Sequence, residues 1–260
     1  MMQKENARPR LMGFMEPSAI LLQQLSGVKV ILFDAGNTLL AYRRPLRILL
    51  QDYLMQHQVI IPRERISKAL ETIHPRYEYL RRRCRTQEEE QQMWLDLSHE
   101  LLHLLLPAYS RTLAGSLAEW FMESWRLHKV FGDVRSTLRA LKEWGYRLGV
   151  VSNWEPSLPR LLERLGLAKF FEVVVSSAGE GLWKPDSRLF LAAVDRFGVA
   201  PGEVANVGDD PVRDVESAEA AGLKAILLDR FNSYPNIHAL RISTLKELLL
   251  LFPGHLRKQV

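Results

Sequence analysis

The chain has 260 residues, of which 47% are hydrophobic and 25% charged, and its 35 Lys and Arg against 30 Asp and Glu give a net charge of +5. This balance excludes a disordered chain and a collagen-like repeat, and the lone Cys84 excludes a disulfide scaffold. A reducing cytoplasm fits one cysteine best, and the small net charge gives no reason to expect a nucleic-acid partner. No apolar run reaches the roughly 18 residues of a membrane helix, so no membrane association is expected.

The first part of the chain contains one expected strand and a long helical stretch. Residues 1–27 are expected to be a surface extension rather than a signal peptide, because Glu16 and Pro17 interrupt them before a useful apolar stretch forms. The apolar run 29–34 (KVILFD) is expected to be a strand. The following stretch of about a hundred residues has helical spacing and no convincing strand. Four helices are expected there, over 45–58, 63–83, 88–106 and 109–129.

From residue 136 onward, apolar runs of strand length alternate with amphipathic stretches. The expected strands cover 147–153, 170–177, 203–210 and 223–230, and the expected helices cover 158–167, 187–199 and 212–223. This alternation is typical of a parallel sheet that is covered on both faces. We therefore predict an α/β fold, with a doubly wound, Rossmann-like parallel sheet and an all-helical insert. The core would comprise 28–42 and 131–260, and the helical cap 43–130.

Polar side chains follow the expected core strands, at the sheet edge where ligands of such folds bind. They are Asp34, Ser152, Asn153, Lys184, Asp209 and Asp214. Clustered carboxylates repel one another unless a cation lies among them, and oxygen ligands favour Mg²⁺ over zinc. Carboxylates, a hydroxyl, a lysine and a divalent cation together indicate phosphoryl transfer.

These segments resemble the four motifs of the haloacid dehalogenase (HAD) superfamily. The matching segments occur in the superfamily's order over roughly 29–230 and are FDAGNTLL, VVSN, WKPD and VGDDPVRD. The helical insert resembles the superfamily's cap. On the metal side, the resemblance implies that Asp34 is both a nucleophile, forming an aspartyl intermediate, and a Mg²⁺ ligand. The carbonyl of Gly36 and the side chain of Asp209 would be further ligands, and Asp214 would hold the water shell of the metal.

On the substrate side, the resemblance implies that Ser152, Asn153 and Lys184 hold the transferring group. Ser152 would donate a hydrogen bond to it, and Lys184 would balance its charge. The expected activity is that of a Mg²⁺-dependent hydrolase, a phosphatase that acts on a small phosphorylated metabolite. The sequence does not indicate which metabolite this is, nor the oligomeric state.

Gly36 departs from the pattern of the superfamily's phosphatases, which normally carry a second Asp there as the general acid and base. Loss of such a group is worth about 10²–10⁴ in rate. Three explanations stay open. Asp210 or a cap residue could replace the acid, with Tyr42, Arg43 and Arg44 nearest in sequence. The leaving group could need little protonation, as in acyl or aryl phosphates, or the protein could bind phosphate with little turnover.

Two other HAD chemistries also need no second Asp. Metal-independent 2-haloacid dehalogenases expel halide, and the Ser152-Asn153 pair is similar to theirs, but their fourth motif lacks an acidic pair such as Asp209 and Asp214. Phosphonatases use a cap lysine, and the only lysine well inside the insert is Lys68, which we expect on the surface. The dehalogenase therefore stays as the alternative enzyme.

Three further features are ambiguous in sequence. His99-Glu100-Leu101-Leu102-His103 matches the HExxH zinc motif, but it lies in the insert among leucines, where an amphipathic helix is the simpler interpretation. The basic run 81–85 is followed by the acidic run 88–90, which predicts a solvated, charge-mixed helix face. Trp154 and Trp183 flank two motifs, where they could line the pocket or belong to the core.

Overall fold

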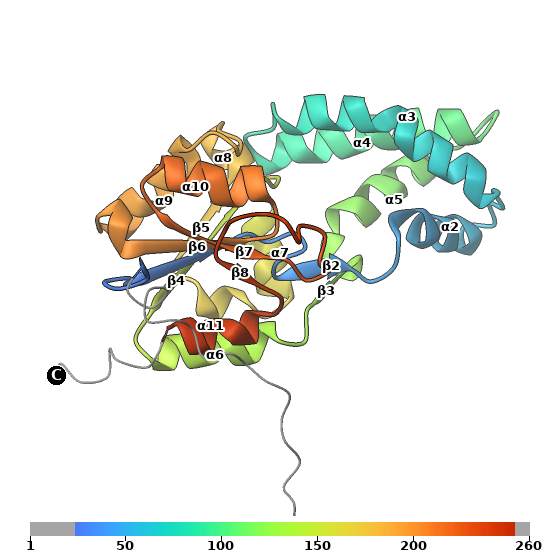
Figure 1. The fold of residues 1–260 in the computed structure, drawn as a ribbon. Helices are drawn as coiled ribbons and strands as arrows, with labels where there is room; N and C mark the ends of the chain where they lie inside the picture. Colours follow the sequence, from blue (N-terminus) through green and yellow to red (C-terminus); the bar gives the residue numbers. More distant parts are fainter. Residues whose placement is uncertain (1–23, 253–260) are drawn as a thin grey trace, which may run out of the picture.

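The computed structural model describes residues 24–252, and Figure 1 shows a sheet-containing body beside a group of helices. Most of the expected N-terminal extension, residues 1–27, lies outside this range. Within it, none of the helices combines the length and apolar character that a membrane crossing requires.

The body is built on a six-stranded sheet in the order β5-β4-β1-β6-β7-β8, in which all neighbouring strands run parallel. The strands are β1 (Val30–Phe33), β4 (Arg147–Ser152), β5 (Val173–Ser176), β6 (Val204–Gly208), β7 (Lys224–Leu228) and β8 (Arg241–Ile242). In register, Phe33 pairs with Val150 and with Val207, so β1 lies between β4 and β6 and the three strands end together. The predicted parallel α/β fold is confirmed.

Helices cover both faces of this sheet because the side chains of each buried strand alternate between two apolar cores. Ile31 and Phe33 belong to the core on one face, and Val30 and Leu32 belong to the core on the other. The first core includes α6 (Val134–Glu143), α7 (Leu158–Arg164) and α11 (Leu248–Leu251), and the second includes α9 (Arg188–Phe197) and α10 (Ser217–Ala220). Figure 1 shows the sheet between these layers, with the short α8 (Ser177–Glu180) beside α9.

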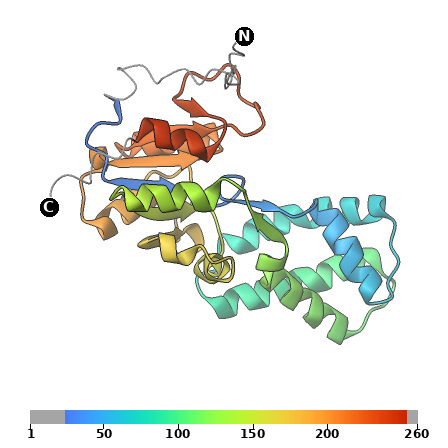
Figure 2. The same cartoon turned by 90° about the horizontal axis from the view of Figure 1, so that it is seen from below.

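The four helices of the insert pack around an apolar core of their own, beside the sheet body (Figure 2). They are α2 (Leu46–Gln56), α3 (Arg63–Arg81), α4 (Gln87–Leu105) and α5 (Arg111–Met122). Side-chain caps start two of them: Thr86 accepts a hydrogen bond from the Glu89 amide at the start of α4, and Ser110 accepts one from the Leu113 amide at the start of α5.

The expectation that no strand lies in the insert region was wrong at both of its ends. β2 (Leu40–Tyr42) and β3 (His128–Val130) form an antiparallel pair, in which Tyr42 is opposite His128. The expected helix over 109–129 ends at Met122 and is followed by the short 3₁₀ helix η1 (Ser124–Arg126). The two chain segments that join the helices to the body therefore run side by side as a ribbon.

Candidate active site

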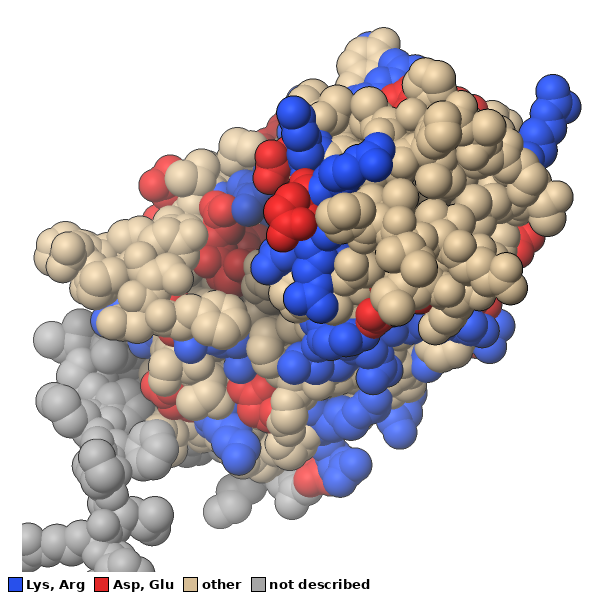
Figure 3. All heavy atoms as spheres, turned by 90° about the vertical axis from the view of Figure 1, so that its right-hand side faces the viewer, with Lys and Arg blue, Asp and Glu red and all other residues tan. Residues whose placement is uncertain are grey.

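The ends of β1, β4 and β6 open onto a small polar pocket of about 170 Å³. Its lining comprises Asp34, Gly36, Asn37, Ser152, Asn153, Trp154, Lys184, Asp209, Asp210, Arg213 and Asp214. The structure thus brings together every residue that the sequence singled out for the site. In Figure 3, acidic side chains lie in a hollow of the surface, and Lys and Arg side chains border it.

Lys184 lies at the centre of this arrangement and is almost completely buried. Its Nζ donates to Oδ1 of Asp34 at 2.9 Å and to Oδ1 of Asp214 at 2.6 Å. Ser152 Oγ donates to the same Asp34 oxygen at 3.0 Å. Although burial alone would lower the pKa of the Lys184 ammonium, the ion pairs with Asp214 and Asp34 raise it. Lys184 therefore stays positively charged between the two carboxylates.

Asp214 is held in place by backbone groups of the loop after β6. It lies in the π-helix η4 (Pro211–Glu216), and its Oδ2 accepts a hydrogen bond from the Asp210 amide at 3.0 Å. The buried amide of Asn206 donates to the Asp214 carbonyl at 2.8 Å. Gly208 leaves room for the carboxylate, since a Cβ there would lie 2.2 Å from Cγ of Asp214.

Three carboxylates converge in this pocket. One oxygen from each of Asp34, Asp209 and Asp214 lies within 4.8 Å of the others. Burial raises the pKa of Asp209 to about 7, and the negative charges of Asp34 and Asp214 add to this effect. Lys184 is hydrogen-bonded to two of the three carboxylates, and Arg213 of the same pocket pairs with Asp210, so a further cation among the three would relieve their repulsion.

These donors fit Mg²⁺, because all of them are oxygen atoms and two of the carboxylates are buried. The carbonyl of Gly36, the fourth expected ligand, accepts a hydrogen bond from the Thr38 amide at 2.6 Å, which occupies one of its two lone pairs. Asn37 between them has a left-handed backbone, with φ of 51°, and its side chain donates to Asp209.

Asn153 connects two of the motifs. Its side-chain amide donates to the Lys184 carbonyl at 3.0 Å, and its side-chain oxygen accepts from the Lys184 amide at 2.8 Å. Both ends of the Asn153 side chain are thus used to position the backbone of Lys184. That Asn153 also contacts the substrate stays a prediction.

Two of the proposed replacements for the missing acid, Asp210 and Arg44, already have charged partners. Asp210 caps η4 by accepting hydrogen bonds from the Val212 and Arg213 amides, and it pairs with the Arg213 side chain. Burial alone would raise the pKa of Asp210, but the contacts with Arg213 lower it below its usual range. Arg44 is paired with Asp52. A Cβ on Gly36 would lie 3.7 Å from the Trp154 ring and 4.0 Å from Oδ2 of Asp34.

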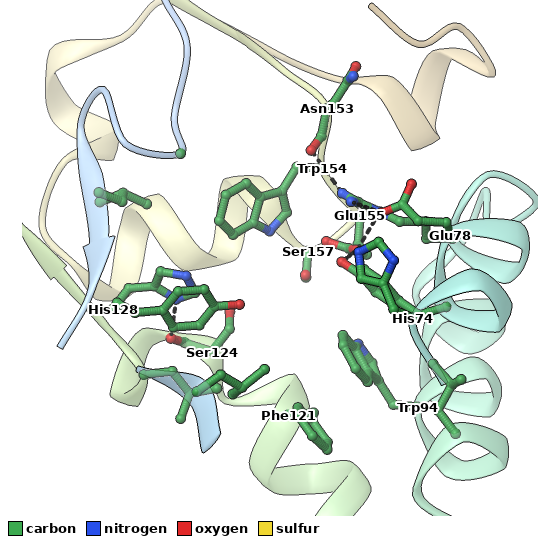
Figure 4. Close-up of a pocket in the computed structure, with 18 of the residues that line it drawn as sticks. His74, Glu78, Trp94, Phe121, Ser124, His128, Asn153, Trp154, Glu155 and Ser157 are labelled. Atoms are coloured by element: carbon green, nitrogen blue, oxygen red, sulfur yellow. Dashed lines mark hydrogen bonds and ion pairs between the residues drawn. The ribbon is translucent and has the colours of Figure 1, made fainter. Parts of the chain in front are cut away.

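A second, larger cavity of about 410 Å³ adjoins the small pocket and lies between the body and the helical insert. The two spaces share Gly36, Asn37, Asn153 and Trp154. In Figure 4, Trp154 points into the cavity from the body, while Trp94 and Phe121 project from the helices opposite. Tyr42 of β2 also lines this cavity, whereas Trp183 lies under Arg81 with its centroid 4.8 Å from the guanidinium carbon.

The prediction of a solvated helix face over 81–90 was wrong for Arg81, Cys84 and Glu90, which are buried or nearly so, and residues 82–86 lie between α3 and α4 instead of in a helix. The side chain of Arg81 is 13% exposed and Glu90 is 1% exposed. Arg81 lies 3.0 Å from the Glu155 carboxylate and donates to the Asn153 carbonyl at 2.8 Å. Glu90 accepts hydrogen bonds from the amide and hydroxyl of Ser157 at 2.9 and 2.6 Å.

Sequence reasoning missed these contacts, although a signal was present. Glu90 lies three, four and seven residues before Met93, Trp94 and Leu97, so it stands on the apolar face of α4. A charged residue on such a face indicates a buried partner. Its partner Ser157, however, belongs to the loop after β4, which sequence spacing cannot bring close to α4.

The HExxH segment forms part of α4, as the simpler interpretation predicts. His99 contacts the Tyr109 hydroxyl at 3.2 Å, and Glu100 pairs with Arg76 at 3.4 Å, while His103 is exposed. Within residues 24–252, the only cluster of three or more candidate metal-binding side chains consists of Asp34, Asp209 and Asp214. Lys68 is exposed on α3, also as expected.

Comparison with known proteins agrees with these motifs. Residues 28–222 match the sequence profile of the haloacid dehalogenase-like hydrolase family. A phosphoserine phosphatase from Thermus thermophilus is 38% identical over 141 residues, which are 53% of this chain and 57% of that protein. The chain therefore spans little more than half the length of this curated relative.

Two solved structures have the same fold over nearly all of their length. A HAD phosphatase from Thermococcus onnurineus has a TM-score of 0.64, with 87% of this chain and 99% of that chain covered. A 2-haloacid dehalogenase from Pseudomonas syringae has a TM-score of 0.63, with 86% of this chain and 97% of that chain covered. Both are 24% identical to this chain, so they support the fold and do not separate the two chemistries. With the family profile matched from Val28 to Gly222, the chain belongs to the haloacid dehalogenase-like hydrolase family.

Proposed function

We propose that this protein is a Mg²⁺-dependent phosphatase that forms an aspartyl-phosphate intermediate on Asp34. The observation that supports it most is the convergence of three carboxylates within 4.8 Å, with Lys184 hydrogen-bonded to two of them. A buried acidic cluster of this kind suits a divalent cation and a phosphate together, and it is poor surroundings for a departing halide. The phosphatase relative from Thermus thermophilus points the same way.

In this proposal, residues 28–42 and 131–260 form the catalytic core and residues 43–130 the cap. The phosphate group occupies the small pocket, and the rest of the substrate extends into the 410 Å³ cavity between core and cap. When bound, Mg²⁺ would be held by Asp34, Asp209, Asp214 and the Gly36 carbonyl, and it would supply positive charge that lets an anionic phosphate enter an acidic pocket.

The residues of the chain have distinct parts in the reaction. An Asp34 oxygen attacks phosphorus, so that a bond from Asp34 to phosphorus forms as the bond to the leaving oxygen breaks, and its electron pair departs with the leaving group. Ser152, which donates to Asp34 in the structure, turns its hydroxyl to the phosphoryl group. Lys184 holds its positive charge beside the oxygens where negative charge develops. Water then hydrolyses the aspartyl phosphate and frees phosphate.

The test is hydrolysis of p-nitrophenyl phosphate with Mg²⁺ and with EDTA in its place. Wild-type protein is expected to release p-nitrophenol only with Mg²⁺. Asp34→Asn removes the nucleophile and is expected to lower kcat by about 10³ or more. Asp195→Asn is the matched control, because Asp195 is exposed on α9, away from the pocket. Full activity of Asp34→Asn, or of the wild type in EDTA, would contradict the proposal.

The same protein samples test the alternative chemistries. Release of chloride from a 2-chloroacid in EDTA, with no phosphate released from any ester, would identify a dehalogenase instead. Mg²⁺-dependent binding of inorganic phosphate with no turnover of p-nitrophenyl phosphate or acetyl phosphate would identify a phosphate-binding protein.

A further inference from the structure

The larger cavity has the size and position of a leaving-group site. Its volume of about 410 Å³ falls in the usual range for small-molecule sites. Four residues line both this cavity and the small pocket, namely Gly36, Asn37, Asn153 and Trp154. An ester whose phosphorus lies beside Asp34 can therefore extend its organic part past Trp154 into the cavity.

Aromatic rings form the cavity on two sides. Trp94 and Phe121 are stacked with centroids 4.7 Å apart and planes 8° apart, and Tyr77 stacks on Trp94 with centroids 5.5 Å apart. On the side of the body, the Trp154 ring lies edge-on to the His128 ring, with the two ring centroids 5.4 Å apart. Figure 4 shows Trp154 facing Trp94 and Phe121 across open space. Flat, rigid walls of this kind favour a planar ring, through apolar burial and aromatic contacts.

The charged groups of the cavity are already paired. Arg81, the only Lys or Arg among the described residues of its lining, contacts Glu78 at 3.1 Å and Glu155 at 3.0 Å. The Glu90 carboxylate accepts from Ser157, and Glu155 also accepts from the Tyr77 hydroxyl at 2.6 Å. The other basic groups of the described lining are the imidazoles of His74 and His128, and burial lowers the pKa of His128. No Lys or Arg of the described lining is left over for a second anionic group of the substrate, such as a carboxylate or another phosphate, so the cavity favours an uncharged organic part.

The chemistry at Gly36 points to the same class of substrate. Residue 36 has no carboxylic acid to protonate the departing oxygen, which favours a leaving group that departs as a stable anion. Phenols have pKa values near 10, as tyrosine shows, and they leave as phenolates far more readily than aliphatic alcohols leave as alkoxides.

We infer that the substrate is the phosphate monoester of an uncharged phenol, with its aromatic ring in the cavity between Trp154 and the Trp94–Phe121 pair. This inference rests on the proposed function and names its substrate class. In the first step the bond from Asp34 to phosphorus forms, and the bond from phosphorus to the aryl oxygen breaks. The phenolate leaves with the electron pair and takes a proton from water in the open cavity.

The experiment compares kcat/KM for phenyl, cyclohexyl and acetyl phosphates with Mg²⁺. Phenyl and cyclohexyl phosphate have rings of similar size and differ in the leaving oxygen, so phenyl phosphate is expected to be favoured about 100-fold or more. If kcat/KM for phenyl phosphate and for cyclohexyl phosphate agreed within threefold, the inference would be overturned while the phosphatase proposal stayed intact. If none of the three phosphates were hydrolysed, the inference and the phosphatase proposal would both be overturned.

Gly36→Asp tests the missing acid directly. The nearest atoms to a Cβ there are at ordinary contact distances, so a side chain can begin at residue 36 without a clash. It is expected to raise kcat/KM for cyclohexyl phosphate about tenfold or more, and for phenyl phosphate by less than about threefold. An equal gain with both esters would contradict the inference, since protonation would then matter equally for both.

Ser124→Phe tests the position of the ring. Ser124 lines the cavity and is half-buried, so a phenyl group there would occupy part of the space. We expect kcat/KM for phenyl phosphate to fall about tenfold or more, and for acetyl phosphate, whose small leaving group does not reach as far, to fall much less. Ser136→Phe, at an exposed position of α6, is the control and should change neither value. Equal losses with both substrates in Ser124→Phe would exclude the cavity as the ring site.

Discussion

Gly208 shows how closely the carboxylate centre is packed. A Cβ at this position would lie 2.2 Å from Cγ and 2.4 Å from Cβ of Asp214, closer than real Cβ atoms approach. Gly208 is not among the glycines with positive φ, so the neighbouring side chain and not a left-handed backbone requires a glycine here. The end of β6 and the Asp214 carboxylate can share this space only because residue 208 has no side chain.

Gly208→Ala is therefore expected to push Asp214 away from Lys184 and to lower kcat/KM with p-nitrophenyl phosphate roughly 10- to 100-fold, with half-maximal activity at a higher Mg²⁺ concentration. Steady-state kinetics over a Mg²⁺ titration measure both effects. Gly202→Ala is the matched control, because a Cβ there meets nothing within 4 Å. If both variants behaved like the wild type, Asp214 would not need its present position.

At the residue scale, the candidate site could largely be predicted because its members follow strands of one parallel sheet. Asp34, Ser152 and Asp209 each come directly after an apolar run, and sheet geometry brings such positions together. The Asp210-Pro211 pair is also a sequence signal for the start of a helix, and it could have predicted that Asp210 is used as a cap. The position of Trp154 beside Gly36 could not be predicted, since it depends on how the loop after β4 folds.

At the scale of elements, α4 contributes a buried carboxylate to the contact between insert and body. Burial raises the pKa of Glu90 from its ordinary value of 4.5 to about 7, although the hydrogen bonds from Ser157 oppose this. The nearby charge of Glu155 adds to the increase. A pKa above the unfolded value means that the folded state binds the proton more tightly, so ionisation of Glu90 opposes folding.

The free energy of unfolding of the wild type is therefore expected to fall as pH rises from about 4.5 to about 7, and this contribution is constant outside that range. Glu90→Gln removes the titration and keeps one acceptor and one donor for Ser157. It should be more stable than the wild type by up to roughly 3 kcal/mol at pH 8, with no difference below pH 4.5. Urea unfolding at several pH values measures this. Glu88→Gln, at an exposed position, is the control, and a pH-independent difference for Glu90→Gln would contradict the expectation.

The success of sequence reasoning at this scale depended on element length. Strands β1, β4 and β6 are nearly continuous apolar runs, and such runs are typical of parallel strands that are buried on both faces. β2 and β3 have three residues each, and their side chains range from buried to exposed. Three residues are too few to show a period of two, so the ribbon could not be predicted.

At the scale of the whole molecule, the guanidinium of Arg81 connects the helical insert to loops of the candidate site. Arg81, the last residue of α3, contacts Glu155 and the Asn153 carbonyl, and it stacks over Trp183, which precedes Lys184. The fold of each part could be predicted separately, since each has its own apolar core. The contact between them could not, because it depends on charged side chains that sequence patterns place on the surface.

Arg81→Met removes the cation and leaves the Glu155 carboxylate, which is 4% exposed, without it. We expect a loss of about 3–5 kcal/mol in the free energy of unfolding, as for other buried pairs that lose one partner. Arg83→Met, at an exposed position two residues later, should change it by less than about 0.5 kcal/mol. Adding Glu155→Gln to Arg81→Met should recover part of the loss. Equal stability of the two Arg variants in urea titrations would show that Glu155 does not need Arg81.

The central position of β1 in the sheet has a consequence for how the chain folds during translation. Both strands that pair with β1 are translated long after it: β4 begins at Arg147 and β6 at Val204. The helical insert, whose apolar core is separate, is synthesised in full before either strand exists. Because protein segments fold as they emerge, the insert can adopt its structure first, while β1 waits unpaired for its neighbours. A nascent chain arrested before residue 204 would thus carry the complete helical insert and Asp34, but not the strand that brings Asp209 and Asp214 beside it.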